Sequence, residues 1–298
     1  MAEMIYEKKA YAKINLGLDV LRRREDGYHE LRMIMQTVGI YDTVTFEKTD
    51  KRGEITLWTD NHLLPTDEHN LMVKAAKKMW ECYDLPGGLS MTLKKKIPMA
   101  AGLAGGSSDA ACVIKGISEI YGLGLSTEEL CKTGVTIGAD VPYCIVGGTC
   151  LAEGIGEKLT LIGESLAGTA TVIIKPDFDV STKYVYENLH ADTLSYHPDI
   201  DAQMKAVGEG DLKGCVSLMG NVLERVSVTK YPEIDEIKEE LKQLGAMGAM
   251  MSGSGPSVFG IFADRITAEK AAAKLAERRK TAAVFATEWI SREDIAKG

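Results

Sequence analysis

Residues 98–111 read P-M-A-A-G-L-A-G-G-S-S-D-A-A, and the patterns on either side predict the order strand, glycine-rich loop, helix. Before the stretch, apolar residues alternate as in a strand, and after it they recur at helical spacing as far as Tyr121. Gly102, Gly105 and Gly106 permit backbone angles and close approaches that a Cβ would prevent. Free N–H groups and the positive end of a helix dipole would then converge on a small volume. The stretch is therefore a candidate phosphate-binding loop.

The same stretch also fits a turn without a ligand. Ser107, Ser108 and Asp109 place side chains of the helix-capping type at the expected start of the helix. However, no Lys-Ser or Lys-Thr follows the last glycine, as it would in a Walker A loop, and the glycines lack the G-x-G-x-x-G spacing. From these residues alone, phosphate binding and a plain turn both remain open.

Length and composition favour a two-domain globular protein. A chain of 298 residues exceeds the usual size of one domain. Small residues separate two patterned regions near residues 161–168, so we expect domains at residues 1–163 and 164–298. No apolar run approaches the length of a membrane helix, and the first nine residues lack the apolar core of a signal peptide. We expect a cytoplasmic protein with no membrane partner.

Charge and cysteine content exclude further classes. The net charge of −8 disfavours a nucleic-acid partner, because binding to a phosphate backbone needs a basic field. The lysine and arginine runs at 22–24 and 94–96 leave an anionic small substrate possible, although such runs are more often solvated faces. The six cysteines form no C-x-x-C pair, and the histidines show no metal-binding spacing. We expect reduced thiols without zinc, in a monomer or a homodimer.

Two candidate catalytic residues, Lys13 and Asp140, can also be explained without a catalytic role. Residues 10–20 alternate strictly between apolar and polar, which places Lys13 and Asn15 together on one face of a strand. Such a pair usually faces solvent. Asp140, in G-A-D-V-P, follows an expected helix and is a common turn residue. The local pattern therefore leaves the roles of Lys13 and Asp140 undecided.

The remaining periodicity predicts an α+β protein. Ser126 and Glu129 form the S-x-x-E pattern of a capping box. The expected strands cover residues 33–38, 44–46, 54–58, 143–146, 171–175, 257–262 and 282–289. The expected helices begin at 66 or 67, 126, 181 or 182, 199, 211, 232 and 268.

Six stretches in the same order resemble one known family. The string P-x-x-x-G-L-x-G-G-S-S-x-A-A resembles the ATP-binding motif of the GHMP kinases, which include galactokinase and the homoserine and mevalonate kinases. The other stretches resemble a branch of that family whose acceptor carries a cytidine diphosphate group, and together they span essentially the whole chain. They are A-K-I-N-L-G-L at 12–18, G-Y-H-E-L at 27–31, N-L-M-V-K-A at 70–75, G-A-D-V-P at 138–142 and S-G-S-G-P-S-V-F-G at 252–260.

The resemblance implies a fold, a reaction and two cofactors. It implies a two-domain α+β GHMP kinase fold, with a ribosomal S5-like N-terminal domain, a ferredoxin-like C-terminal domain and the active site between them. The implied reaction is phosphorylation of a hydroxyl group by ATP with Mg²⁺. Lys13 matches the lysine that holds the acceptor hydroxyl, and Asp140 matches the proposed base. A lysine near Asp140 would keep it ionised and stabilise a developing alkoxide.

The resemblance also implies binding residues. His29 matches a cytosine-recognising histidine, Tyr28 and Tyr186 match aromatic positions that sandwich the ring, and residues 253–257 would support the phosphate loop. The substrate-side positions are Asn15, Tyr28, His29, Thr182 and Tyr186. The ATP-side positions are Asn70, Lys95, Pro98, Gly102, Leu103, Ala104, Gly105, Gly106, Ser107 and Ser108, with Ser108 also the implied Mg²⁺ contact.

The sequence departs from the family pattern at one position, and two alternative functions remain. Asp109 stands where relatives often carry asparagine, so it either points away from the phosphates or meets the metal. A GHMP kinase acting on homoserine or mevalonate is the first rival, but a small acyclic acceptor has no base to stack on Tyr28 and Tyr186. The second rival is a silent nucleotide-binding regulator, which would have no need of both Lys13 and Asp140.

Overall fold

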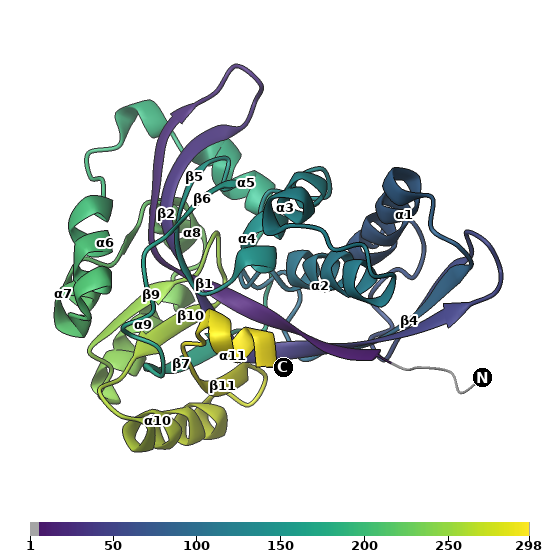
Figure 1. Cartoon of the computed structure of the whole chain (residues 1–298). Helices are drawn as coiled ribbons and strands as arrows, with labels where there is room; N and C mark the ends of the chain where they lie inside the picture. The colour runs from purple at the N-terminus through teal and green to yellow at the C-terminus, as the bar shows by residue number, and fades with distance from the viewer. Residues whose placement is uncertain (1–5, 298) are drawn as a thin grey trace.

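The computed structural model describes residues 6–297 and confirms the α+β class (Figure 1). Within those residues, seven strands form the larger sheet, in the order β3-β4-β2-β1-β8, with β5 paired to β2 and β6 to β5. Its longest strands, β1 (Tyr6–Arg23) and β2 (His29–Thr49), form an antiparallel hairpin that runs across the molecule (Figure 1). The others are β3 (Ile55–Thr59), β4 (Gly88–Lys94), β5 (Thr149–Gly154), β6 (Lys158–Leu161) and β8 (Gly220–Asn221).

The smaller sheet has the ferredoxin-like strand order. Its strands are β7 (Ala170–Lys175), β9 (Gly248–Met251), β10 (Val258–Ile261) and β11 (Ala283–Glu288). They lie in the order β11-β7-β10-β9, and every neighbouring pair is antiparallel. This fourth-first-third-second order is the arrangement expected for the C-terminal part of the chain.

Helices pack on both sheets. Helices α1 and α2 contact each other and share a core with the hairpin. This core includes Phe46, Met79 and Ile117. Helices α9 and α10 cover the smaller sheet. The bounds are α1 Leu71–Tyr83, α2 Gly105–Ile120, α3 Thr127–Val135, α4 Val141–Val146, α5 Thr182–Asn188, α6 Ile200–Glu209, α7 Leu212–Ser217, α8 Glu224–Lys230, α9 Glu233–Gln243, α10 Arg265–Arg278 and α11 Arg292–Lys297.

The middle of β1 is covered on both faces. Ile14 and Leu16 belong to a core cluster that also contains Phe259 of β10 and Trp289, so the two sheets pack together there. The strand predicted for residues 10–20 is confirmed, with Lys13 and Asn15 on one face, but register shifts near Lys13 and Gly17 interrupt its strict alternation, and the polar face does not meet bulk water. Lys13 is only 4% exposed and Asn15 is fully buried, so solvation does not explain why these residues are polar.

Two local predictions were wrong, and a third was incomplete. Residues 143–146 form the end of helix α4 rather than a strand, because a short apolar run fits a buried helix as well as a strand, and Pro142 favours a helix start. Helix α1 begins at Leu71, several residues later than expected, because the side chain of Asn70 caps it by accepting from the Met72 N–H. Residues 33–38 and 44–46 belong to the single strand β2.

The proposed domain boundary stays a prediction. Strand β6 ends at Leu161 and β7 begins at Ala170, so the chain passes from one sheet to the other between them. Strand β8, from the C-terminal half, nevertheless pairs with β1. Residues 1–5, on which part of the signal-peptide argument rests, lie outside the described residues.

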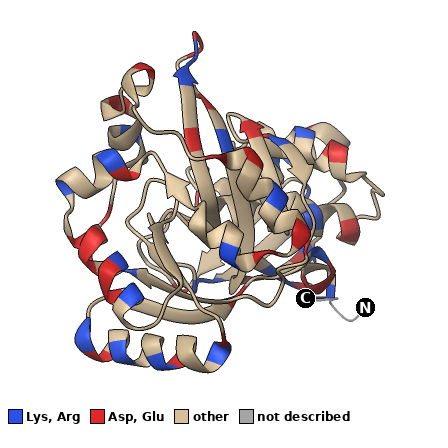
Figure 2. Ribbon diagram, turned by 90° about the vertical axis from the view of Figure 1, so that its left-hand side faces the viewer, with Lys and Arg blue, Asp and Glu red and all other residues tan. Residues whose placement is uncertain are grey.

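Charged residues are mixed on the surface seen in Figure 2. Lysines and arginines alternate there with aspartates and glutamates along the helices. On α10, for example, Arg265 pairs with Glu269, and Arg278 reaches Glu240 of α9. Across residues 6–297, no helix combines the length and apolar character needed to cross a membrane.

Candidate active site

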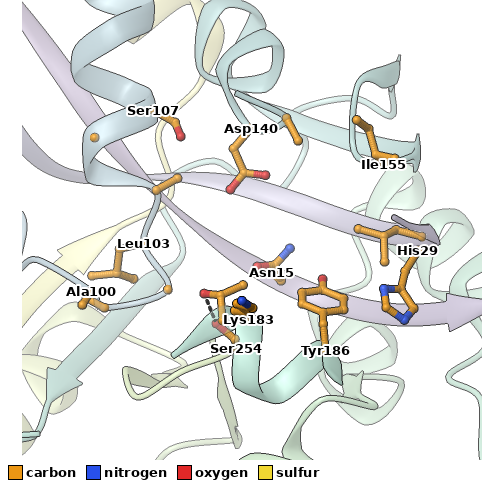
Figure 3. A pocket seen from close by; sticks show the side chains of 18 of the residues that line it. Asn15, His29, Ala100, Leu103, Ser107, Asp140, Ile155, Lys183, Tyr186 and Ser254 are labelled. Atoms are coloured by element: carbon orange, nitrogen blue, oxygen red, sulfur yellow. Dashed lines mark hydrogen bonds between the residues drawn. The ribbon is translucent and has the colours of Figure 1, made fainter. Parts of the chain in front are cut away.

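A cavity of about 1260 Å³ lies between the phosphate-loop candidate, β1, the start of β2, and α5. It brings together side chains that are far apart in the sequence (Figure 3). Every site residue predicted from the sequence lines this cavity except Ser108.

The glycine-rich loop has the backbone shape of an anion site. Ala100, Gly102 and Ala104 all have positive φ, between 47° and 72°, which is uncommon for alanine. Alternating backbone conformations of this kind turn N–H groups toward a common point. A Cβ on Gly102 would lie 2.2 Å from the carbonyl oxygen of Ser252, so only glycine fits this position.

The first turn of α2 lacks the side-chain cap that the sequence suggested. Its N-cap residue is Ala104, which has no capping side chain, so the prediction that Ser107, Ser108 or Asp109 caps the helix was wrong. Within the described chain, the N–H groups of residues 105–107 have no acceptor. Uncapped N–H groups at a helix start favour an anion, and these open into the cavity.

The loop is held by contacts to both sheets. The backbone N–H of Lys13 in β1 donates to the carbonyl of Leu103 at 3.2 Å. From the loop before β10, Ser252 Oγ donates to the carbonyl of Gly102 at 3.0 Å, and the N–H of Ser257 donates to the carbonyl of Ala101 at 3.3 Å. Of residues 253–257, Ser257 thus contacts the glycine-rich loop, while its role in supporting bound phosphates stays a prediction.

Lys13 and Asp140 face each other at the centre of the cavity. The Lys13 ammonium donates to Asn15 Oδ1 at 2.8 Å and to the Gly102 carbonyl at 3.4 Å, and it lies 3.7 Å from Asp140 Oδ2. The amide of Asn15 is itself held by Met33 Sδ at 3.3 Å. The hydrogen bonds of the ammonium therefore go to neutral oxygens. Because these partners carry no negative charge, the positive charge of Lys13 can act on Asp140 and on a ligand.

Helix α4 presents the Asp140 carboxylate to the cavity. Asp140 is the N-cap residue of α4, but its side chain makes no capping hydrogen bond. In Figure 3 the carboxylate points into the cavity, toward the strand that carries Asn15. The helix is fixed by Tyr143, which is fully buried and donates to the Gly148 carbonyl at 2.7 Å. A rigid helix therefore carries an accessible carboxylate.

Two aromatic rings meet at the far end of the cavity. The rings of His29 and Tyr186 lie 5.1 Å apart at an interplanar angle of 34°. Burial, with a contribution from the charge of Arg23, lowers the pKa of His29, so its imidazole is neutral at pH 7. Tyr28 also lines the cavity but is 58% exposed, at the rim. A planar ligand group suits this end.

Lys95 lies beside the glycine-rich loop, clamped between two carboxylates. Its ammonium contacts Asp42 of β2 and donates to Asp109 Oδ2 of α2 at 2.8 Å. Burial raises the pKa of Asp109 to about 8, although the Lys95 charge opposes this shift. Asp42 also accepts from the backbone of Ile97 at 2.8 Å. The side chain of Asp109 therefore points to Lys95. The sequence had left open whether this side chain points away from the phosphates or meets the metal.

Ser108 is the one predicted site residue that faces elsewhere. It is buried, and its hydroxyl donates to the carbonyl of Tyr11 at 2.6 Å. To reach a metal ion the hydroxyl would have to leave that bond, so this arrangement gives its implied Mg²⁺ contact no support. Ser107, its neighbour, lines the cavity instead (Figure 3).

Sequence reasoning missed two features of the site. Asp42 carried no signal, because an aspartate within an apolar strand has no motif around it. Thr182 and Ser254 share a hydrogen bond of 2.8 Å that ties α5 to the loop before β10. Each of these residues lies in a stretch that the family resemblance had marked, but the sequence did not show that they meet.

Comparison with known proteins gives a consistent result. Two family models match the chain: the GHMP kinases N terminal domain at residues 70–148 and the GHMP kinases C terminal at residues 203–281. The 4-diphosphocytidyl-2-C-methyl-D-erythritol kinase of Lachnospira eligens is 49% identical over 283 residues, which cover 95% of this chain and 98% of that protein.

Solved structures agree. A crystal structure of 4-(cytidine 5'-diphospho)-2C-methyl-D-erythritol kinase superposes with a TM-score of 0.81 at 32% identity, covering 95% of this chain and 99% of the other. Homoserine kinase from Cytophaga hutchinsonii superposes with a TM-score of 0.78 at 20% identity, covering 98% and 97%, which shows a shared fold. The chain therefore belongs to the GHMP kinases and, within them, to the family of the 4-diphosphocytidyl-2-C-methyl-D-erythritol kinases.

Proposed function

We propose that the protein transfers the γ-phosphoryl group of ATP to the 2-hydroxyl of 4-diphosphocytidyl-2-C-methyl-D-erythritol, giving the 2-phosphate and ADP in non-mevalonate isoprenoid precursor biosynthesis. One observation carries the proposal. The Lys13–Asp140 pair lies between the anion-binding loop and the His29–Tyr186 rings, within one cavity.

The loop end of the cavity binds ATP in this proposal. The uncapped N–H groups at the start of α2 receive the phosphates, and residues 98–104 wrap around them. Asn70 and Lys95 border the adenosine side. Because Lys95 is held by Asp42 and Asp109, it shapes this wall of the cavity rather than reaching into it.

Asp140 and Lys13 carry the chemistry. In phosphoryl transfer, the protein mainly aligns the reacting groups and neutralises charge. The accessible Asp140 carboxylate accepts the proton of the acceptor hydroxyl. The Lys13 ammonium, 3.7 Å from that carboxylate, stabilises the alkoxide as it forms.

Mg²⁺ would neutralise charge on the transferring phosphates. It needs only one or two protein carboxylates when nucleotide phosphates supply other ligands. The residues that fit are Asp140, whose side chain is about one-third exposed, and Ser107, whose side chain lies at the loop. Asp109 is taken up by Lys95.

The aromatic end of the cavity selects the acceptor. His29 hydrogen-bonds the edge of the cytosine, and Tyr186 stacks on it, with Tyr28 closing from the rim and Asn15 and Thr182 bordering the sugar. A homoserine or mevalonate kinase needs no such pocket. A silent regulator needs no accessible base beside a lysine. We further propose that the protein acts in the cytoplasm as a monomer or homodimer, without nucleic acid.

The test is ADP release by purified protein with Mg-ATP. The acceptors compared are the cytidyl substrate, the sugar phosphate without its cytidyl group, homoserine and mevalonate. Turnover with the cytidyl compound alone is expected. Turnover with a small acceptor instead would contradict the base pocket, and turnover with none would favour a binding protein. The variant His29→Ala should raise KM for the cytidyl substrate and leave KM for ATP unchanged.

A further inference from the structure

The cavity contains more positive charge than the reaction uses. Among the described residues that line it, the lysines and arginines are Lys13, Arg23, Lys95 and Lys183. Lys13 belongs to the reacting pair, and Lys95 is clamped between two carboxylates. Arg23 and Lys183 have no part in the chemistry proposed above.

Lys183 has a defined position in the cavity wall. It lies in the first turn of α5, next to Thr182 and three residues before Tyr186. Thr182 is bonded to Ser254, and the following Val185 is fully buried, so the helix is anchored on both sides. In Figure 3, Lys183 lies between Ser254 and Tyr186, across the cavity from Asp140.

The ammonium of Lys183 is available to a ligand. Its one ion-pair partner within residues 6–297 is Glu187, at 3.8 Å, and the two side chains are 83% and 61% exposed. An exposed pair at this distance contributes little, because both groups remain solvated. Replacing Glu187 by a more strongly charged ligand therefore costs little.

Lys183 also lies where negative charge must cross the cavity. In the proposed function, the acceptor hydroxyl binds at Lys13 and Asp140, and the base binds at His29 and Tyr186. A diphosphate joins these two ends of the substrate, so it must pass the wall that carries Lys183. Arg23, by contrast, is paired across the hairpin with His29 and lies at the outer end of the base pocket.

We propose that Lys183 binds the diphosphate bridge of the acceptor and selects nucleoside diphosphates over uncharged nucleosides. The inference rests on the proposed function. Because the bridge keeps its charge throughout the reaction, the contact is equally strong before and during phosphoryl transfer. Such uniform binding lowers KM for the acceptor and leaves kcat unchanged.

The experiment measures binding of CDP and of cytidine by calorimetry, without ATP. Lys183→Met should weaken CDP binding about tenfold, the size of one charge-assisted hydrogen bond, and leave cytidine binding unchanged. Lys183→Arg should restore CDP binding. The matched control is Lys205→Met: Lys205 pairs with Glu209 at 3.9 Å, the two are 75% and 64% exposed, and Lys205 does not line the cavity.

Each alternative outcome has a separate meaning. Equal loss of CDP and cytidine binding, or a rise in KM for ATP instead of the acceptor, would overturn the role of Lys183 in diphosphate binding. An active wild-type kinase whose Lys183→Met variant binds CDP normally would overturn that role alone. A wild-type protein that binds neither CDP nor the cytidyl substrate would overturn the proposed function as well.

Discussion

Lys13 and Lys95 line the same cavity and are equally buried, yet their surroundings differ. The ammonium of Lys13 is held by neutral oxygens of Asn15 and Gly102, with the carboxylate of Asp140 farther away at 3.7 Å. The ammonium of Lys95 lies between two buried carboxylates. In the proposed mechanism, the difference means that burial alone does not mark a catalytic lysine. A lysine with neutral partners keeps its charge for a substrate, whereas one between carboxylates uses it within the protein.

The largest expected effect concerns the accessible carboxylate. Asp140→Asn should lower kcat by roughly 10²–10⁴-fold, because the acceptor hydroxyl loses its base. Binding of ATP should stay close to that of the wild type, as measured by calorimetry. Near-normal turnover would remove Asp140 from the mechanism, and with it the functional side of the contrast between Lys13 and Lys95.

Replacement by methionine should mainly lower stability at Lys95 and mainly lower kcat at Lys13. Lys95→Met removes the ammonium that the buried carboxyl groups of Asp42 and Asp109 share and should cost about 3–5 kcal/mol of unfolding free energy. Lys13→Met leaves only the partly exposed Asp140, so it should cost less stability but lower kcat strongly. Urea unfolding and steady-state kinetics of both variants check this, and equal stability losses would break the comparison.

The last prediction concerns the pH dependence of stability. Burial raises the pKa of Asp109 from 3.8 to about 8. A carboxyl whose pKa is higher in the folded protein contributes its full stability below the unfolded value and loses it as pH rises through the folded value. The contribution of Asp109 should therefore decline between about pH 4 and pH 8.

Asp109→Asn should remove that decline. Unfolding free energies of the wild type and the variant, measured at about pH 5 and pH 8.5, test this: the variant should gain relative to the wild type at the higher pH. If the unfolding free energies of both proteins change with pH in the same way, the Asp109 carboxyl is already ionised beside Lys95 in the folded protein at both pH values.

The strongest local signals in the sequence predicted most of the architecture. The alternation around Lys13 and Asn15 predicted a strand with both residues on one face, and the capping box at Ser126 is present with both of its hydrogen bonds. Residues 143–146 were misassigned because an apolar run of four residues carries no usable period. The α2 cap was misassigned because a left-handed alanine leaves no trace in the sequence.

The candidate site could be predicted only in part, for a physical reason. Motifs named candidate ligand-binding residues, but they did not show which contacts those residues make with one another. The clamp around Lys95 joins β2, the end of β4 and α2, and Asp42 lies 53 positions from Lys95 in the chain. Contacts over such separations depend on how the sheet is assembled, which the local sequence does not encode.

The contacts of Gly102 link the site to the assembly of the whole molecule. Its carbonyl oxygen accepts hydrogen bonds from Lys13 and Ser252, and its missing side chain leaves room for the backbone of Ser252. The shape of the loop thus depends on the packing of the C-terminal sheet against the hairpin. A chain whose C-terminal sheet is not docked therefore lacks part of the frame that shapes this loop.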